Sequence, residues 1–264
     1  MRAINLKTNH LTEPVGIDAG ALFLSWQCAD GVRQTAYEIE LTANGETVWH
    51  SGKVQSTAMH ADATTVGGSR VRGCWRVRLW DENDTPGAWS AAHFETGLAQ
   101  SDWQGKWVDP ETEEIDIPGD DAINAFARPN WESKQAEKKA AGKGAAEPYK
   151  PHRPASYLRK SFTASRGDAR LYITAKGLYA AWLNGKRIGD MVLAPGSFTG
   201  DKHLAAQTYD VTEYLRDGEN ELLVALGDGW HRSTGGVDGD RDLFGDTLGV
   251  LFQLEVDGQA VCVS

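Results

Sequence analysis

Three features of the sequence predict an all-β protein built as two consecutive β-sandwiches. Short segments alternate apolar and polar residues with a period of two, which is the pattern of half-buried strands. Gly, Asp and Asn residues separate these segments and supply the turns of antiparallel sheets. The length of 264 residues exceeds the about 100 to 200 residues over which one core usually grows, so two modules are expected.

The first predicted module covers residues 1–100, with strands expected from residue 20 to about 97. Two strands show the alternation best, and their inward residues are Leu22, Leu24 and Trp26 in one and Trp75, Val77 and Leu79 in the other. Asn44-Gly45 predicts a tight hairpin, because both residues tolerate the positive φ that such turns require. Roughly seven short antiparallel strands in about 80 residues fit a fibronectin type III-like sandwich.

The alternating pattern stops between Asp109 and Pro154. This stretch holds an acidic run, formed by Glu111, Glu113, Glu114 and Asp116, and a Lys/Ala-rich segment from Glu132 to Ala146. The second segment has helical propensity but no apolar stripe with which a helix could dock. We therefore expect an exposed, partly disordered insertion at about 109–154.

The second predicted module covers residues 101–264, where strands resume at Tyr157. Asn184-Gly185 marks a second hairpin. The clearest alternating strand has its inward side formed by Leu248, Val250, Phe252, Leu254 and Val256. This pattern predicts a jelly-roll-type sandwich. Because Val261 to Ser264 form a strand still in progress after an Asp257-Gly258 turn, we expect the sandwich to be truncated at its C-terminus.

Composition and charge exclude several classes of partner. The formal net charge of -10 opposes binding to nucleic acids and to anionic membrane surfaces, since both need clustered Lys and Arg. The N-terminus lacks the apolar core of a secretory signal, and no stretch approaches the roughly 20 apolar residues of a membrane span, so we expect a cytoplasmic protein. The three cysteines, Cys28, Cys74 and Cys262, are expected to be reduced thiols.

Several motifs in order resemble the N-terminal region of bacterial α-L-rhamnosidases. In the second module they are Arg170 to Tyr179, Ala181 to Asp190, Leu193 to Gly196, Gln207 to Thr212, Gly218 to Asn220 and Leu226 to Trp230. In the first module they are Glu13 to Asp18, Leu24 to Trp26 and Trp75 to Asp81, which resemble the fibronectin-like domain that precedes the jelly-roll domain in that family.

The resemblance implies a longer parent enzyme that hydrolyses terminal α-L-rhamnosides with inversion. It also implies that an (α/α) helical barrel further along the parent chain carries the chemistry, and this sequence contains none of that barrel. The sequence departs from the family pattern at Ala180, where an acidic residue is common, and again in the loop Gly196 to Gly200. These departures argue against sugar binding by that loop.

No residue of this chain is predicted to be catalytic. Because the parent that the chain resembles is a glycoside hydrolase, the question whether this chain is an enzyme stays open. Glycosidases need two carboxylates about 5 to 9.5 Å apart, one of them kept protonated in a dry pocket. The richest acidic cluster is Asp238, Asp240, Asp242 and Asp246, in a Gly-rich loop where solvation explains the charges. A calcium site formed by these four residues is the alternative, because oxygen ligands two residues apart can converge on one cation.

The candidate ligand-binding residues are Trp230, Arg232, Asp228 and Asn184. Sugars stack their apolar faces on indole rings while their hydroxyls bond to Asp, Asn and Arg. Trp230 is the best aromatic candidate because it follows Gly229 at a strand end and precedes His231 and Arg232. Packing against a neighbouring domain is the competing interpretation of this tryptophan.

Three functional hypotheses follow from the sequence. In the favoured one, the chain is a non-catalytic scaffold whose partner is the missing catalytic barrel of the parent chain. In the second, the jelly-roll module binds L-rhamnose or a rhamnose-containing carbohydrate, with calcium as a possible cofactor. In the third, the chain is a self-sufficient hydrolase, which turnover of a rhamnoside by the purified chain would demonstrate.

Overall fold

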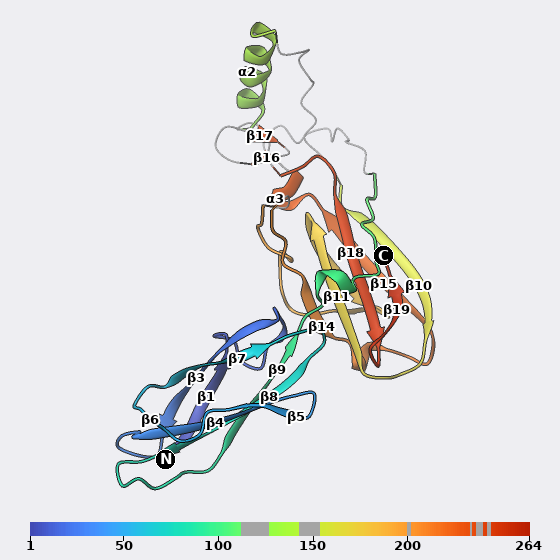
Figure 1. The fold of residues 1–264 in the computed structure, drawn as a ribbon. Helices are drawn as coiled ribbons and strands as arrows, with labels where there is room; N and C mark the ends of the chain where they lie inside the picture. The colour runs from blue at the N-terminus through green and yellow to red at the C-terminus, as the bar shows by residue number, and fades with distance from the viewer. Residues whose placement is uncertain (112–126, 143–153, 200–201, 233, 236–239, 242–243) are drawn as a thin grey trace. The chain divides into compact units, whose positions relative to one another are not determined.

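The structure is a computed structural model that describes residues 1–111, 127–142, 154–199, 202–232, 234–235, 240–241 and 244–264 (Figure 1). The chain divides into two compact units, Met1–Trp103 and Gln104–Ser264. Strands dominate both units, which confirms the prediction of an all-β protein.

The first unit is a sandwich of two sheets. Its elements are β1 (Arg2–Thr8), β2 (Val15–Ile17), β3 (Gly20–Ala29), β4 (Ala36–Ala43), β5 (Glu46–His50), β6 (Val54–Gln55), β7 (His60–Val66), β8 (Arg72–Trp80), β9 (Ser90–Thr96) and the 3-10 helix η1 (Gln100–Asp102). One sheet has the order β1-β3-β7, and the other has the order β2-β9-β8-β4-β5 with β6 paired to β4.

The inward residues of this sandwich are those that the alternation predicted. Leu22, Leu24, Trp26, Trp75, Val77 and Leu79 are all buried. The indole of Trp75 donates from Nε1 to Oγ1 of Thr8 at 2.9 Å, so its one polar atom is satisfied inside the core. Asn44 and Gly45 have φ of 49° and 86° and join β4 to β5, which confirms the first predicted hairpin.

Strands β1 and β2 precede residue 20, where the sequence pattern placed the first strand. The pairing of β1 with β3 shifts between Ile4 and Lys7, so a bulge interrupts the period of two. The buried residue at the end of β1 is Thr8, a polar residue. Because of these two features, β1 does not show the alternation of apolar residues by which strands are predicted.

The second unit is a sandwich of two four-stranded sheets with one additional strand pair. Its elements are the helix α2 (Ala127–Ala140), β10 (Ser156–Ala164), β11 (Ala169–Lys176), β12 (Leu178–Leu183), β13 (Lys186–Arg187), β14 (Gln207–Asp210), η2 (Thr212–Tyr214), β15 (Gly218–Gly227), the helix α3 (Gly229–Arg232), β16 (Thr234–Gly235), β17 (Asp240–Arg241), β18 (Gly249–Val256) and β19 (Gln259–Val263). The sheets have the orders β10-β15-β12-β13 and β14-β11-β18-β19, and β16 pairs with β17.

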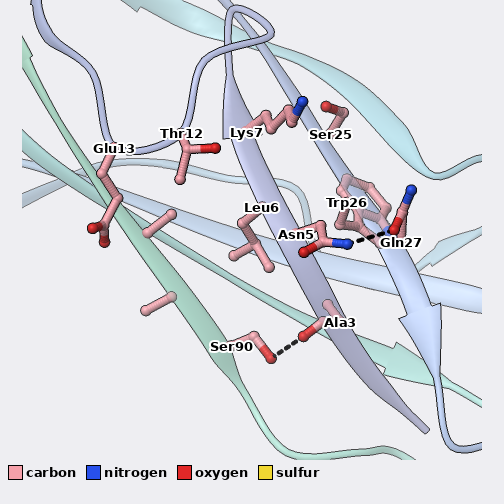
Figure 2. Close-up of a pocket in the computed structure, with 12 residues that line it drawn as sticks. Ala3, Asn5, Leu6, Lys7, Thr12, Glu13, Ser25, Trp26, Gln27 and Ser90 are labelled. Carbon is pink, nitrogen blue, oxygen red and sulfur yellow. Dashed lines mark hydrogen bonds between the residues drawn. The ribbon is translucent and has the colours of Figure 1, made fainter.

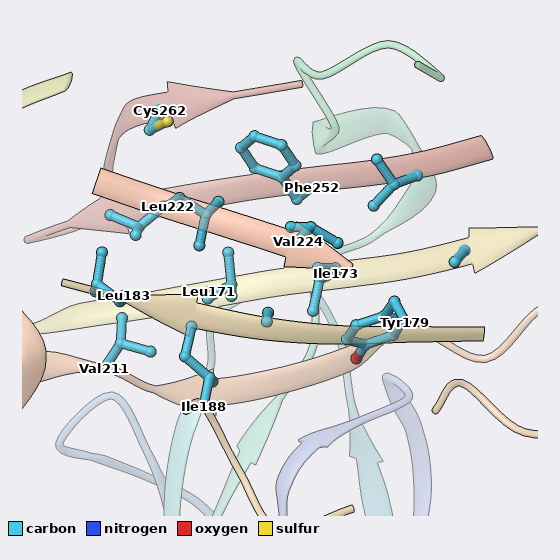
Figure 3. Packing of buried hydrophobic residues seen from close by; sticks show 14 of the residues in the cluster. Leu171, Ile173, Tyr179, Leu183, Ile188, Val211, Leu222, Val224, Phe252 and Cys262 are labelled. Carbon is cyan, nitrogen blue, oxygen red and sulfur yellow. The ribbon is translucent and has the colours of Figure 1, made fainter. Parts of the chain in front are cut away.

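The core of this unit lies between the two four-stranded sheets (Figure 3). Leu171, Ile173 and Val250 come from one sheet and Leu183, Leu222 and Val224 from the other, and each is at most 1% exposed. The opposite side of β18, which the alternation predicted to be solvent-facing, is also covered: Gln253 is fully buried and Glu255 is 3% exposed. The segment at Gln104 lies against this side of the strand, since its backbone N–H donates to the side-chain oxygen of Gln253 at 2.7 Å.

The predicted insertion at 109–154 is described only in part. Helix α2 begins at Ala127, five residues before the Lys/Ala-rich segment, and ends at Ala140. The helical propensity of this segment therefore predicted a helix correctly. Residues 113–116 of the acidic run lie outside the described residues, as do residues 143–153, so the expected partial disorder remains a prediction.

The three cysteines are free thiols, as expected. Cys28 lies near the end of β3 and Cys74 near the start of β8, which belong to different sheets. Within the described ranges, no helix combines the length and the apolar composition that crossing a bilayer requires.

Candidate functional site

The predicted ligand-binding residues of the second unit lie mainly where β15 ends. The strand stops at Gly227, and the single helical turn α3 follows at once with Gly229 at φ 52°. A Cβ on Gly229 would lie 2.3 Å from Cγ of Leu178, so only glycine fits this turn. The turn carries Trp230 outward, where its side chain is 45% exposed, while the next two residues are buried.

Asp228 and Arg232 form a closed pair beside Trp230. Nε and Nη2 of Arg232 lie 3.0 Å and 2.9 Å from Oδ1 of Asp228. The side chains of Arg232 and Asp228 are 6% and 17% exposed, so the charges largely neutralise each other away from water. This pair holds α3 against the end of β15, and Trp230 is the accessible member of the predicted group.

His231 and Trp230 line a small hollow at the same end of the sandwich. The rest of its wall is formed by Ala175, Gly177, Gly196, Phe198 and Leu204, and its volume of about 10 Å³ matches about one water molecule. Nε2 of His231 lies 3.1 Å from the backbone oxygen of Thr247. Burial lowers the pKa of His231, which favours a neutral imidazole. The hollow is too small for a sugar ring, so a sugar at this end would have to stack on the outside of Trp230.

Asn184 is not part of this group. Leu178, at the start of β12, pairs with Gly227, whereas Leu183, next to Asn184, pairs with Leu222 in the middle of β15. At about 3.3 Å of rise per residue, the five steps from residue 183 to 178 alone span roughly 16 Å.

The Asn184 amide serves the predicted hairpin instead. Asn184 and Gly185 have φ of 53° and 78°, so the turn is confirmed. Nδ2 of Asn184 donates to the backbone oxygen of Tyr214 and to Oδ1 of Asn220, both at 2.8 Å, and its Oδ1 accepts from the N–H of Glu221 at 3.0 Å. All of its hydrogen-bonding ends are engaged. We therefore assign Asn184 a role in the fold.

The proposed calcium ligands fall mostly outside the described structure. Asp238 and Asp242 are not described, Asp240 is described only as backbone in β17, and Asp246 is exposed. In the part of the chain that the structure describes, no group of three or more His, Cys, Asp or Glu side chains could hold a metal ion. The calcium site remains a hypothesis based on sequence.

A larger hollow lies in the first unit, where the sequence analysis predicted no site residue. It is a groove of about 780 Å³ that runs beside β1 and reaches β9 (Figure 2). Its floor includes Leu6 and Trp26, and its rim carries the polar side chains of Asn5, Lys7, Thr12, Glu13, Ser25, Gln27 and Ser90. Sequence reasoning missed this groove, because a bulge at Asn5 in an edge strand shapes it and a bulge is hard to see in an alternating pattern.

The fold places this chain among proteins that carry β-sandwich modules in tandem. Residues 3–100 match the family described as "Rha78A-like, N-terminal immunoglobulin domain", and residues 165–263 match the "Alpha-L-rhamnosidase N-terminal domain". The chain thus belongs to the α-L-rhamnosidase family and represents its N-terminal region, which confirms the resemblance carried by the sequence motifs.

Individual relatives agree with this assignment. An α-L-rhamnosidase of Formosa agariphila is 32% identical over 276 residues, which cover 95% of this chain and 26% of the relative. The solved α-L-rhamnosidase of Dictyoglumus thermophilum superposes with a TM-score of 0.76 at 26% identity, over 100% of this chain and 29% of that one. The enzyme of Aspergillus terreus gives a TM-score of 0.73 at 28% identity, over 98% and 28%. The chain therefore spans between a quarter and a third of the length of these relatives.

Proposed function

We propose that this chain is the non-catalytic N-terminal part of an enzyme that hydrolyses terminal α-L-rhamnosides. Its role is that of a scaffold that packs on the catalytic barrel of the longer protein and shapes access to the active site. The observation that carries the proposal is the pair of family matches, one for each module, within relatives three to four times as long.

A run of exposed apolar residues in the second unit supports the scaffold role. Met191, Val192 and Leu193 are 43%, 70% and 55% exposed. Three consecutive exposed apolar residues are unfavourable in water unless a partner covers them. Leu193 also has a φ of 58°, a conformation that is uncommon for a residue with a side chain and is often found at functional sites.

This run is held firmly at both ends. On one side, the N–H of Ile188 donates to the oxygen of Ala181, and on the other, the N–H of Tyr179 donates to the oxygen of Ala194, both at 2.8 Å. Ile188 and Ala194 are buried at 5% and 2% exposure. The loop that carries the three apolar side chains is therefore anchored to the sandwich on both sides, as a docking surface for another domain requires.

The test compares the catalytic barrel of the longer enzyme with and without residues 1–264. We expect the barrel alone to be less stable and less active on rhamnosides, and equal stability and activity would refute the scaffold role. Within the longer enzyme, Val192→Asp should lower stability by placing a charge in an apolar interface. The matched control is Val32→Asp, since Val32 is 87% exposed in the first unit.

A second candidate function is binding of L-rhamnose by the second unit, with calcium assistance if the Asp238 to Asp246 loop holds the ion. The exposed indole of Trp230 beside the Asp228 and Arg232 pair supports it. Trp230→Ala should then weaken rhamnose binding, whereas Trp107→Ala, at another exposed tryptophan of the same unit, should not. An unchanged rhamnose affinity in Trp230→Ala would eliminate this site.

A further inference from the structure

We propose that the groove beside β1 in the first unit binds a neutral oligosaccharide. The proposal rests on the geometry of this unit alone, and only the choice of L-rhamnose as the first probe rests on the proposed function. At about 780 Å³ the groove falls within the 300 to 1,000 Å³ or so that small-molecule sites occupy.

A β-bulge shapes the wall of the groove. Ile4 pairs with Gln27 and Lys7 pairs with Ser25, so Asn5 and Leu6 together stand opposite the single residue Trp26. Asn5 has a φ of 51°, in the left-handed region that asparagine tolerates better than most residues with a side chain. Bulges of this kind redirect side chains, and this one places the Asn5 amide on the groove side beside Gln27 (Figure 2).

The two amides leave a matched donor and acceptor for a ligand. Nδ2 of Asn5 donates to Oε1 of Gln27 at 2.6 Å. Oδ1 of Asn5 and Nε2 of Gln27 have no hydrogen-bond partner among the described residues, and both residues are exposed. A pair consisting of one acceptor and one donor suits a sugar hydroxyl, because a hydroxyl both donates and accepts.

The charges of the lining favour a neutral ligand. The groove contains one cation, Lys7, and one anion, Glu13, which lie on different elements of its rim (Figure 2). An anionic ligand would also meet the net charge of -10 of the whole chain. The half-buried side chain of Leu6 supplies an apolar surface for the apolar face of a pyranose ring.

An added peptide strand fits this groove less well than a sugar. A strand that extends a sheet needs regularly spaced backbone donors and acceptors, and the bulge at Asn5 interrupts that spacing. Oγ of Ser90 also donates to the oxygen of Ala3 at 2.7 Å and joins β9 to β1 across one end (Figure 2). A sugar does not require a continuous strand edge.

The test is a two-dimensional NMR titration of the 264-residue chain with L-rhamnose, a neutral rhamnose disaccharide and glucuronate as the anionic comparison. We expect the neutral sugars to shift the side-chain amides of Asn5 and Gln27 and the backbone amides around them. Gln27→Ala should weaken binding about fivefold, the effect of losing one hydrogen bond, without changing the melting temperature. Asn5→Gly keeps the positive φ, removes the amide and should have the same effect.

Gln55→Ala is the matched control, because Gln55 is an exposed glutamine on β6 of the same unit. Absence of shifts at Asn5 and Gln27 with all neutral sugars up to about 50 mM would overturn the proposal. Shifts confined to Trp230 and its neighbours would also overturn it and would assign the sugar to the second unit. Neither outcome bears on the scaffold role, which the barrel comparison tests separately.

Discussion

The two sandwiches differ in the apolar side chains that they expose to solvent. In the first unit, charged residues on β4 and β8 pair across the strands: Glu38 lies opposite Arg78 and Glu40 opposite Arg76. The two arginines also lie over the ring of Trp89, at 4.8 Å and 4.5 Å from its centre. The second unit also has ion pairs between neighbouring strands, such as Arg170 with Asp210, but it exposes in addition a run of three apolar loop residues, Met191 to Leu193, and the aromatic side chains of Tyr157 and Trp230.

This difference indicates separate roles for the two modules. The outward face of β4 and β8 satisfies its own charges through ion pairs and cation–π contacts, so this face needs no partner. The exposed apolar residues of the first unit, such as Val32 and Val48, are scattered singly along the chain. The second unit exposes a continuous run, and docking to another domain is the physical reason for keeping it.

The largest effects should come from the two separate cores. Trp75→Ala removes a fully buried indole and leaves Thr8 without its hydrogen bond, so the first unit should lose about 3 to 5 kcal/mol of stability. Leu171→Ala should cost the second unit about 2 to 5 kcal/mol. Amide hydrogen exchange resolved by residue measures both. If either substitution increased exchange equally in both units, the two cores would be one cooperative unit and the comparison would fail.

Each unit should also depend on one buried amide side chain. Gln34 accepts from Nε1 of Trp26 at 3.0 Å and donates to the oxygens of Ser56 and Ala58. Asn220 donates to the oxygens of Arg216 and Gly218, and it accepts from Asn184.

Gln34→Ala and Asn220→Ala should each destabilise their own unit by about 1 to 3 kcal/mol, because several buried groups lose their partners. Denaturant unfolding measures this loss. Gln55→Ala, at an exposed glutamine, is the control and should change little. A loss as small as that of the control would show that water replaces the amide in these positions.

The ion pairs of the first unit predict a dependence of its stability on pH. Burial opposes the ionisation of Glu38, but hydrogen bonds from Arg78 and His50 outweigh it and hold the pKa of this carboxyl below its ordinary value of 4.5. A lowered pKa in the folded state stabilises the protein above the unfolded pKa, and this contribution is lost as pH falls through the folded pKa. The first unit should therefore lose stability below about pH 4.5.

Arg78→Ala should cost about 1 kcal/mol at neutral pH and should reduce this loss in acid. Thermal unfolding of the variant and the parent between neutral pH and about pH 3 tests it. Arg33→Ala, at an exposed arginine of the same unit, is the control. If Arg78→Ala lost as much stability in acid as the parent chain, other carboxylates would determine the pH dependence of stability.

The sequence predicts the regular strands of both units well because their buried residues alternate. It predicts poorly where a polar residue is buried or a strand is irregular, as at Thr8 in β1 and at Gln253 in β18. The same limit applies to function. The sequence predicted Trp230 as an aromatic residue next to polar residues at a strand end, and the structure places it there, exposed. The position of Asn184 away from Trp230 could not be predicted, because its partners, Tyr214 and Asn220, lie far along the chain. The groove at Asn5 depends on a bulge and could not be seen.

The substitutions with the smallest expected effect test most directly whether the exposed run of the second unit exists for a partner. In the 264-residue chain by itself, Val192→Asp and Val32→Asp should each change stability by no more than about 0.5 kcal/mol, because both side chains are exposed. Equal, near-zero effects measured by denaturant unfolding would show that the run at Met191 to Leu193 contributes nothing to the folding of its own unit. A larger loss for Val192→Asp would mean that the run stabilises the sandwich itself, and the argument that it exists for a partner would be withdrawn.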